Sequence, residues 1–491
     1  MDAIAAIFAS GSPLANVVDA IDSFVWGWVM IVLLLGTHLY MTIRTKFIQR
    51  KIGTAIKLSI SNTDASAEGD VSQFGALATA LAATIGTGNI VGVATGLFFG
   101  GPGAIFWMWI TGVFGIATKY AETYISVKYR VKDHNGEMLG GAMYALERGF
   151  KHKGFGKVLG VLFALFAFIA SFGIGASVQS NALSGVITSY ISPMVDSPDQ
   201  MLGVSVMIGV ILMILVGIVI MGGIKSITRV TTKLVPLMAL LYVAGCLVII
   251  GMNGQYVGEA IAMIVTCAFT GEAAFGGAVG SGIALALQYG FKRGLFSNES
   301  GLGSAPLVAA NATTKNPARQ ALVSMSGTFW DTVIVCAITG IMLVSTMLAN
   351  PDIQAGLLSG EISAAAQLTT AAFGKIPVLG PIVLSVGMIL FSYSTMLGWA
   401  QYGNRAVAYL FGKKGIRPYQ VVFLLFVFWG VIGGGDLVWN ISDITNALMA
   451  VPNCIAVIGL AAVISKGTQH YVYDKNLDEI DDTPIPQFDT K

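Results

Sequence analysis

One stretch of the chain, residues 82–96, combines polar side chains and glycines in a pattern that could bind a small solute. It reads AATIGTGNIVGVATG and lies within an uncharged run, 74–99. That run is long enough to cross a bilayer, which takes about 20 apolar residues. Yet Gly86 and Gly88 flank Thr87, and glycine costs roughly 1 kcal/mol against alanine in a helix interior. We therefore expect a membrane helix that breaks here.

A break inside a membrane leaves backbone N–H and C=O groups bare, and each costs several kcal/mol unless something bonds it. A half-helix that begins near Gly88 would aim its free N–H groups at a carboxylate. Freed carbonyl oxygens are hard ligands that suit a cation, and Thr84, Thr87 and Asn89 add side-chain oxygens. The stretch thus predicts a transport site. The alternative is a packing helix, because its glycines form two overlapping GxxxG steps.

A second apolar segment, residues 258–290, is interrupted by the sequence FTGEAAFGG at 269–277. Glu272 is a carboxylate at membrane depth, which makes it a functional candidate. Alternatively, Glu272 lies at the outer mouth or accepts from N–H groups freed by the break. Phe275 either packs in the core or covers the ligand.

Other polar residues lie inside apolar segments. Gln179 must find partners within the bundle, either on another helix or on a ligand. The adjacent hydroxyls of Ser394 and Thr395 could complete an ion shell with carbonyl oxygens of the first break. The alternative is that they bond back to the preceding turn of their own helix.

Two more carboxylates fall within apolar segments. Glu122 has Lys119 one turn before it, so a satisfied ion pair is expected, whereas Asp331 has no obvious partner. The sequence shows no pattern of a nucleophile with a general base, and no phosphate-binding loop in a soluble domain. We therefore expect no enzyme activity and no nucleic-acid partner.

The composition is that of an integral membrane protein. Of the 491 residues, 55% are hydrophobic and 11% are charged, against about 25% charged in a soluble domain. The four cysteines lie in apolar runs without paired spacing, and the four histidines are scattered. This pattern predicts neither disulfides nor a zinc or haem site.

The apolar segments predict eleven crossings. They lie at about 24–43, 74–99, 103–127, 156–187, 201–222, 234–251, 258–290, 321–347, 378–411, 420–434 and 439–465. With the N-terminus outside, all but Lys375 of the 28 lysines and arginines fall in or beside cytoplasmic segments, as the positive-inside rule requires. We therefore expect a multi-pass cell-membrane protein with a cytoplasmic C-terminus.

The two interrupted segments are five crossings apart and run in opposite directions. Two five-helix units of opposite orientation, each beginning with a broken helix, form the inverted repeat of the LeuT-type fold. The prediction is an all-α membrane protein with this 5+5 repeat and one extra N-terminal helix. Its parts are a first helix and loop at 1–72, repeats at 73–253 and 254–468, and a disordered cytoplasmic tail at 469–491.

Four sequence blocks carry a family resemblance. They are ATIGTGNIVGVA at 83–94, GGPGAIFWMW at 100–109, GGAMY at 140–144 and NESGLGSAP at 298–306. In these blocks the chain resembles the alanine/glycine:cation symporters, also called sodium:alanine symporters. The resemblance implies a LeuT-type transporter that moves small neutral amino acids, mainly alanine and glycine, together with sodium by alternating access.

The resemblance also implies a set of site residues. The amino-acid pocket would be lined by Thr87, Gly88, Gln179, Phe275, Thr395 and Trp399. By the pattern of the broader fold, sodium would be held by the backbone oxygens of Ala82 and Ile85 and the hydroxyls of Ser394 and Thr395. A second ion site would use Thr84 and Asn89.

Two other functions are compatible with the sequence. One is a transporter of the same fold that protons drive through Glu272 or Asp331, which uptake in a pH gradient without sodium would reveal. The other is a passive channel or a membrane-embedded assembly subunit, which would show no counterflow exchange of labelled alanine.

Overall fold

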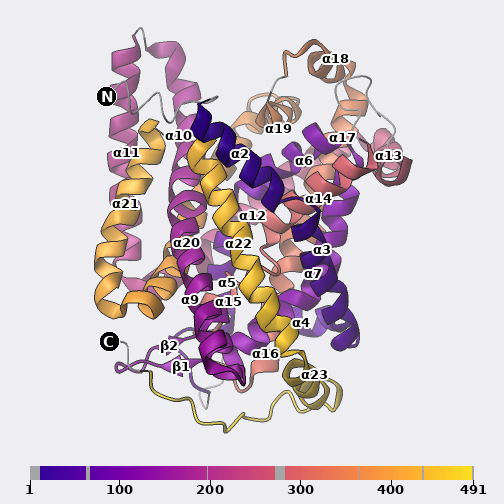
Figure 1. Cartoon of the computed structure of the whole chain (residues 1–491). Helices are drawn as coiled ribbons and strands as arrows, with labels where there is room; N and C mark the ends of the chain where they lie inside the picture. The colour runs from indigo at the N-terminus through magenta and orange to yellow at the C-terminus, as the bar shows by residue number, and fades with distance from the viewer. Residues whose placement is uncertain are drawn as a thin grey trace.

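The computed structural model describes residues 12–61, 67–195, 197–270, 282–362, 364–433 and 436–488. Helices form a bundle with one small antiparallel hairpin, in which β1 (Val131–Lys132) pairs with β2 (Met138–Leu139) (Figure 1). We call the end of the bundle that carries this hairpin the hairpin face. The opposite end carries α18 (Pro351–Ser359) and α19 (Ala365–Phe373).

Long apolar runs fold as helices because a helix satisfies its backbone hydrogen bonds internally, as a hydrocarbon environment demands. The remaining helices are α2 (Pro13–Val25), α3 (Trp28–Arg44), α4 (Ile52–Ser59), α5 (Gln73–Thr84), α6 (Val93–Gly100), α7 (Gly103–Lys128), α8 (Ala142–Gly149), α9 (Lys153–Ala170), α10 (Val178–Ile191), α11 (Pro198–Ile220), α12 (Gly223–Met252), α13 (Val257–Thr270), α14 (Ile283–Asn298), α15 (Pro306–Ala309), α16 (Pro317–Thr328), α17 (Ala337–Ala349), α20 (Leu379–Phe411), α21 (Ile416–Gly433), α22 (Asp436–Gly459) and α23 (Ala461–Thr468). Short π-helical stretches connect α5 with α6 (Gly88–Gly92), α9 with α10 (Ser171–Ser177) and α16 with α17 (Phe329–Cys336).

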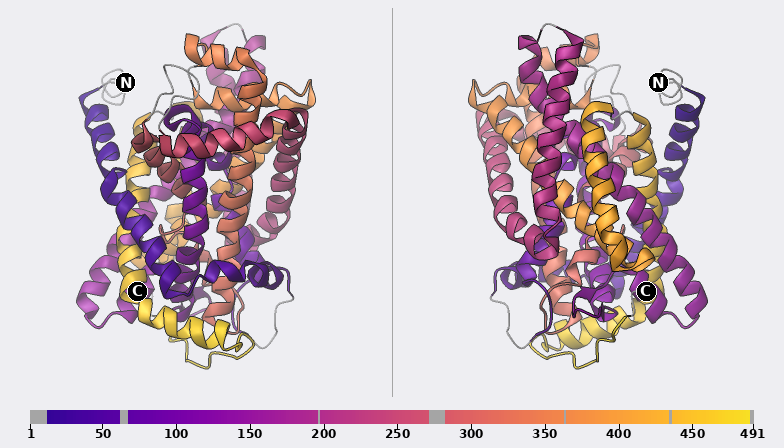
Figure 2. Two further views of the ribbon diagram at one scale, coloured as in Figure 1. Left: turned by 90° about the vertical axis from the view of Figure 1, so that its right-hand side faces the viewer. Right: turned by 90° about the vertical axis from the view of Figure 1, so that its left-hand side faces the viewer.

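Within the described residues, eight helices are long and apolar enough to cross a membrane, and the bent pair α5–α6 makes nine. The sequence predicts eleven. Helix α7 is long enough at 26 residues but less apolar than the others. The other predicted crossing is divided between α13 and α14, which flank residues 271–281, outside the described part. Helices α2 and α3, which occupy the part of the chain where an additional N-terminal helix is predicted, lie at the edge of the bundle (Figure 2).

The outward faces of the peripheral helices are apolar. Large exposed side chains on α11 include Leu202, Met207, Ile211, Ile214 and Ile218. A soluble monomer rarely exposes a contiguous apolar face of this kind. These side chains therefore suit contact with lipid. The largest buried cluster instead lies around α5 and α6, where side chains of α12 and α17 pack against them.

The acidic C-terminal stretch, predicted to be disordered, is folded as far as Phe488. After a π-helical turn at Gln469–Tyr473, it runs extended along the hairpin face, drawn in yellow at the bottom of Figure 1. The N–H of Lys132 donates to the carbonyl of Pro486 at 2.9 Å, and the N–H of Phe488 donates to the carbonyl of Lys132 at 2.7 Å. The prediction was wrong because it weighed the composition of the segment alone, whereas the partners come from distant parts of the chain.

A cluster of charges ties the hairpin to the end of α20. Arg405, which is 2% exposed, donates from Nη2 to Glu137 Oε1 at 2.7 Å. Lys413 lies 3.1 Å from the other oxygen of Glu137 and also contacts Asp133. These pairs hold the hairpin against α20, and the paired residues Glu137 and Arg405 are 268 positions apart in the chain.

This cluster predicts acid sensitivity. Burial raises the pKa of Glu137, but Arg405 and Lys413 outweigh it and hold the pKa below its ordinary value. Stability from such a group is present above the unfolded pKa of about 4.3 and is lost as the pH falls towards the folded pKa. We expect Glu137→Gln to lower the unfolding free energy by about 1–3 kcal/mol near neutrality and to flatten the loss in acid. Thermal unfolding in detergent across pH measures this effect, with the exposed Glu361→Gln as control; an unchanged acid profile would contradict it.

Candidate functional site

The predicted break is present in the first repeat. Helix α5 ends at Thr84, the helix resumes near Gly88, and the axes of the two halves differ by 51°. Ile85, between them, is extended (φ −74°, ψ 96°). The break is buried, so its polar groups need partners from the protein or from a ligand.

Asn89 supplies one of these partners. Its Oδ1 accepts from the N–H of Gly86 at 2.9 Å, in place of a helical carbonyl. Its Nδ2 donates to Asp331, at 2.8 Å to the carboxylate and 3.1 Å to the backbone carbonyl. Asn89 therefore joins the break to the π-helical stretch that follows α16.

Asp331 is a fully buried carboxylate at this junction. Besides Asn89, it accepts from Ser297 Oγ at 2.9 Å and from Thr332 Oγ1 at 2.6 Å. No lysine or arginine in the described ranges forms an ion pair with it. A buried negative charge is costly without a compensating charge. This arrangement therefore suits a bound cation or proton.

Helix α20 lies directly against the break. Ser394 Oγ donates to Ala82 O at 3.3 Å and to Phe391 O, one turn back, at 2.9 Å. A Cβ added to Gly86 would lie 2.6 Å from Thr395 Oγ1, so the glycine is what permits this approach. The Thr395 hydroxyl is buried and, among the described residues, has no hydrogen-bond partner. Bonding back to the preceding turn thus applies to Ser394 and not to Thr395.

Gln179, near the start of α10, faces the break from another side. Thr87 Oγ1 lies 3.4 Å from Gln179 Nε2 and 3.5 Å from Oε1, at the long limit of a hydrogen bond. Gln179 Nε2 also donates to Ile174 O at 3.1 Å. Gln179 is therefore bonded within its own helix and also reaches Thr87 across the bundle.

The other predicted residues are placed less directly. Trp399 is buried one turn after Thr395 and packs against Gly175, just before α10. Thr84 donates back to Ala80 O at 3.3 Å, and Asn89 is bonded to Gly86 and Asp331. The second ion site at Thr84 and Asn89 stays a prediction.

The second interrupted segment reaches the first break from α14. A Cβ added to Gly88 would lie 3.3 Å from Ser297 Cα. Phe275 and Glu272 lie outside the described residues. The predicted ion pair of Lys119 with Glu122 is confirmed at 3.0 Å.

Sequence reasoning left Asp331 without partners and did not select Ser297, Thr332 or Cys336. The available signal was Asp331 itself, a carboxylate in an apolar helix. Its partners come from the break, from the end of α14 and from its own π-helical stretch, an adjacency that helical periodicity does not reveal. Together these groups offer hydroxyl, amide, carbonyl and carboxylate oxygens, which suit a hard cation and a polar solute.

A broken helix that faces hydroxyls of the second half of the chain, inside an apolar bundle, is the architecture of a LeuT-type secondary transporter. The solved structure of MhsT in complex with L-phenylalanine shares the fold, with a TM-score of 0.53 over 82% of this chain and 98% of that one, at 16% identity. The chain belongs to the sodium:alanine symporter family, whose model matches residues 12–483.

Relatives cover almost the whole chain. The sodium/alanine symporter AgcS of Methanococcus maripaludis is 47% identical over 460 residues, which are 93% of this chain and 97% of that protein. The probable sodium/glutamine symporter GlnT of Bacillus subtilis is 33% identical over 467 residues, 94% of this chain and 91% of that protein.

Proposed function

We propose that the chain imports small neutral amino acids, alanine and glycine, across the cell membrane together with sodium. Membership of the sodium:alanine symporter family and the 47% identity with AgcS support this function. The observation that carries it is the Thr395 hydroxyl, which is buried against a broken helix and has no hydrogen-bond partner in the described part of the chain.

In this proposal sodium binds between α5 and α20. The hydroxyls of Ser394 and Thr395 and the carbonyl oxygens of Ala82 and Ile85 are its ligands. The 3.3 Å contact of Ser394 Oγ with Ala82 O supports this set, because it places an oxygen of each helix together. Hard cations prefer oxygen ligands of this kind.

The amino acid binds beside the ion. Its carboxylate faces the half-helix that begins near Gly88, while Thr87, Gln179 and Trp399 bound the side-chain end. Phe275, outside the described residues, stays a predicted lining residue. Such a pocket admits a methyl group and little more. If sodium orders the break, it raises amino-acid affinity, and the amino acid must then raise sodium affinity by the same factor.

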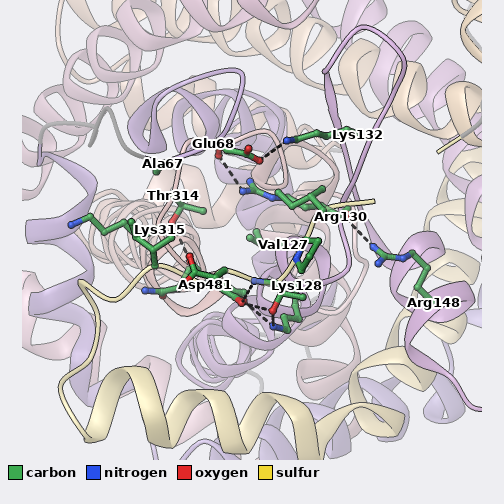
Figure 3. A pocket seen from close by; sticks show the side chains of 17 residues that line it. Ala67, Glu68, Val127, Lys128, Arg130, Lys132, Arg148, Thr314, Lys315 and Asp481 are labelled. Atoms are coloured by element: carbon green, nitrogen blue, oxygen red, sulfur yellow. Dashed lines mark hydrogen bonds and ion pairs between the residues drawn. The ribbon is translucent and has the colours of Figure 1, made fainter. Parts of the chain in front are cut away.

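Alternating access then exposes the site by rocking of one set of helices against the other. The hairpin face is the cytoplasmic side in this proposal. Lys128, Lys132 and Arg148 gather there (Figure 3), and cytoplasmic loops are enriched in such residues.

Asp331 favours a second candidate, in which protons drive the same transport. Its buried carboxylate lies one hydrogen bond from the break and has no ion-pair partner in the described chain. Radiolabelled uptake in proteoliposomes, with sodium, lithium, proton or no gradient and a panel of small amino acids, separates the two. Uptake driven by a proton gradient alone would refute coupling to sodium and support coupling to protons.

We expect Thr87→Val to reduce sodium-driven alanine uptake by about tenfold or more. Valine keeps the shape but removes the hydroxyl that faces Gln179 and the ligand, and a lost hydrogen bond to a charged group costs about 1.5–3 kcal/mol. Initial rates in proteoliposomes measure this effect. Thr370→Val, an exposed position on α19, is the control. Undiminished uptake by the Thr87 variant would count against the pocket as drawn.

A further inference from the structure

Residues 474–488, which we call the strap, cross the hairpin face and contact elements far apart in the sequence (Figure 1). The first half of the strap binds the ends of α7 and α16. Lys128 Nζ lies 2.8 Å from Asp481 Oδ2, and the N–H of Asp481 donates to Lys315 O at 2.8 Å. Asn316, the cap of α16, donates to the strap carbonyls of Leu477 and Glu479, each at 2.9 Å.

The end of the strap binds a different group of elements. Gln487 pairs with Lys132 of β1 as a parallel bridge. The ring of Phe488 meets Tyr144 of α8 with centroids 5.2 Å apart and Tyr409 of α20 with centroids 6.4 Å apart. The hairpin is itself bound to α20 through the Glu137–Arg405 pair.

These two groups include two different helices that lead to or carry residues of the candidate site, α16 and α20. Helix α16 continues into the π-helical stretch that holds Asp331, which is bonded to Asn89 of the break. Helix α20 holds Ser394 and Thr395. Separating the two groups at the hairpin face would therefore stretch the strap or detach one of its ends.

We propose that the strap is a latch that holds the hairpin face closed, and that its release accompanies opening of the site to that face. The proposal rests on the proposed function, because only an alternating-access protein needs this face to open. A latch must also release repeatedly, and the contacts suit that need. The side chains of Lys128 and Asp481 are 26% and 15% exposed, and partly exposed ion pairs are weak and reversible.

Residues 67–72, which we call the lead-in to α5, help to line a pocket together with the strap. A pocket of about 490 Å³ is lined by Asp481, Asp482 and Thr483 of the strap and by Ala67 and Glu68 of the lead-in (Figure 3).

Basic residues around this pocket bind the segment before α5 and the segment before α16. Lys132 pairs with Glu68 at 2.7 Å, and Arg130 donates to Glu68 O at 3.1 Å and to Ala312 O at 2.9 Å. The N–H of Thr313 also donates to Val71 O at 2.8 Å, so the lead-in is fastened at this face. The first half of the broken helix is thus held at the same place as the strap.

Cys336 provides a reporter for opening of the site. It is 1% exposed, and its Sγ lies 3.3 Å from both Asn89 Nδ2 and Ser297 Oγ. In a full-length chain whose other cysteines (Cys246, Cys267 and Cys454) are changed to alanine, a small membrane-impermeant methanethiosulfonate added at the hairpin face should label Cys336 slowly. We expect Asp481→Asn/Phe488→Ala to raise that rate on the order of tenfold, because it removes one ion pair and two aromatic contacts.

Two further variants separate the latch from a general effect of charge or folding. Asp482→Asn removes an acid from the same strap at an exposed side chain for which no ion pair is seen within the described residues, and should change labelling less than about twofold. Asp481→Asn alone should give up to about a fivefold increase. Both are measured in inside-out and right-side-out vesicles.

The outcomes divide clearly. Parental labelling rates in Asp481→Asn/Phe488→Ala would overturn the latch, and so would equal acceleration from both faces, which indicates a loosened bundle. Sodium-driven alanine uptake is measured in vesicles that contain the parental chain, prepared in the same way. If uptake is absent but labelling of Cys336 depends on the strap, the proposed function is refuted and the latch is supported. If uptake is normal but labelling does not depend on the strap, the proposed function is supported and the latch is refuted.

Discussion

Thr395→Val is expected to raise the sodium concentration needed for half-maximal uptake by about tenfold or more. Valine removes one oxygen that makes no hydrogen bond within the described protein, so the folded state loses no bond that is seen. An oxygen that contacts a cation is lost instead, and such a contact is worth about 1.5–3 kcal/mol, or roughly 10- to 150-fold. Initial rates of labelled alanine uptake against external sodium measure the change.

Ser385→Ala is the matched control for this prediction. Ser385 lies on the same helix, α20, ten residues earlier, and its hydroxyl pairs with Tyr190 at 2.8 Å. That spacing places it about 15 Å from Thr395 along the helix axis. Its loss should leave sodium activation within about twofold. If Thr395→Val retained normal sodium activation, the sodium site would be misplaced; equal effects of both variants would point to the helix and not to the site.

Asp331→Asn is expected to reduce uptake by about a hundredfold or more at saturating sodium. The carboxylate accepts from Asn89, Ser297 and Thr332, whereas an amide would turn one N–H₂ group towards these donors. Each buried donor left without an acceptor costs about 1–3 kcal/mol, and Asn89 loses its anchor. Since Asn89 Oδ1 bonds Gly86 N–H, the geometry of the break changes with it.

The measurement pairs uptake with thermal unfolding in detergent. Asp352→Asn is the matched control, because Asp352 is 80% exposed and pairs with Lys375 at 3.3 Å on the surface. We expect its stability to change by less than about 0.5 kcal/mol. Normal transport by Asp331→Asn would show that the buried carboxylate has no part in the transport cycle.

The elements were largely predictable because each follows from local chemistry. The segment expected at 103–127 is α7, Gly103–Lys128, since a run of apolar residues of that length has only a helix to satisfy its backbone. The break was predictable for the converse reason: glycines on both sides of Thr87 weaken the helix, and a bend of 51° is found there.

The contacts of the site were only partly predictable. The adjacent hydroxyls of Ser394 and Thr395 already indicated that they could meet the break. That Thr395 has no hydrogen-bond partner among the described residues, while Ser394 bonds back to its own helix, depends on how α20 is rotated. A second ion site was expected at Thr84 and Asn89, and the structure shows Thr84 donating to its own helix. A threonine can satisfy itself locally, and only the position of Asp331 shows where Asn89 turns instead.

The sequence by itself determined that this chain lies in a membrane, that its first repeat begins with a broken helix, and that the break carries the polar groups of a site. These properties depend on hydrophobicity and on residue types within one segment. Only the tertiary structure decided that Asp331 is the partner of Asn89, that Gly86 admits Thr395, and that an acidic tail is ordered across the hairpin face. Each of these contacts joins residues far apart in the chain, and their energies depend on burial and orientation, which neither composition nor periodicity contains.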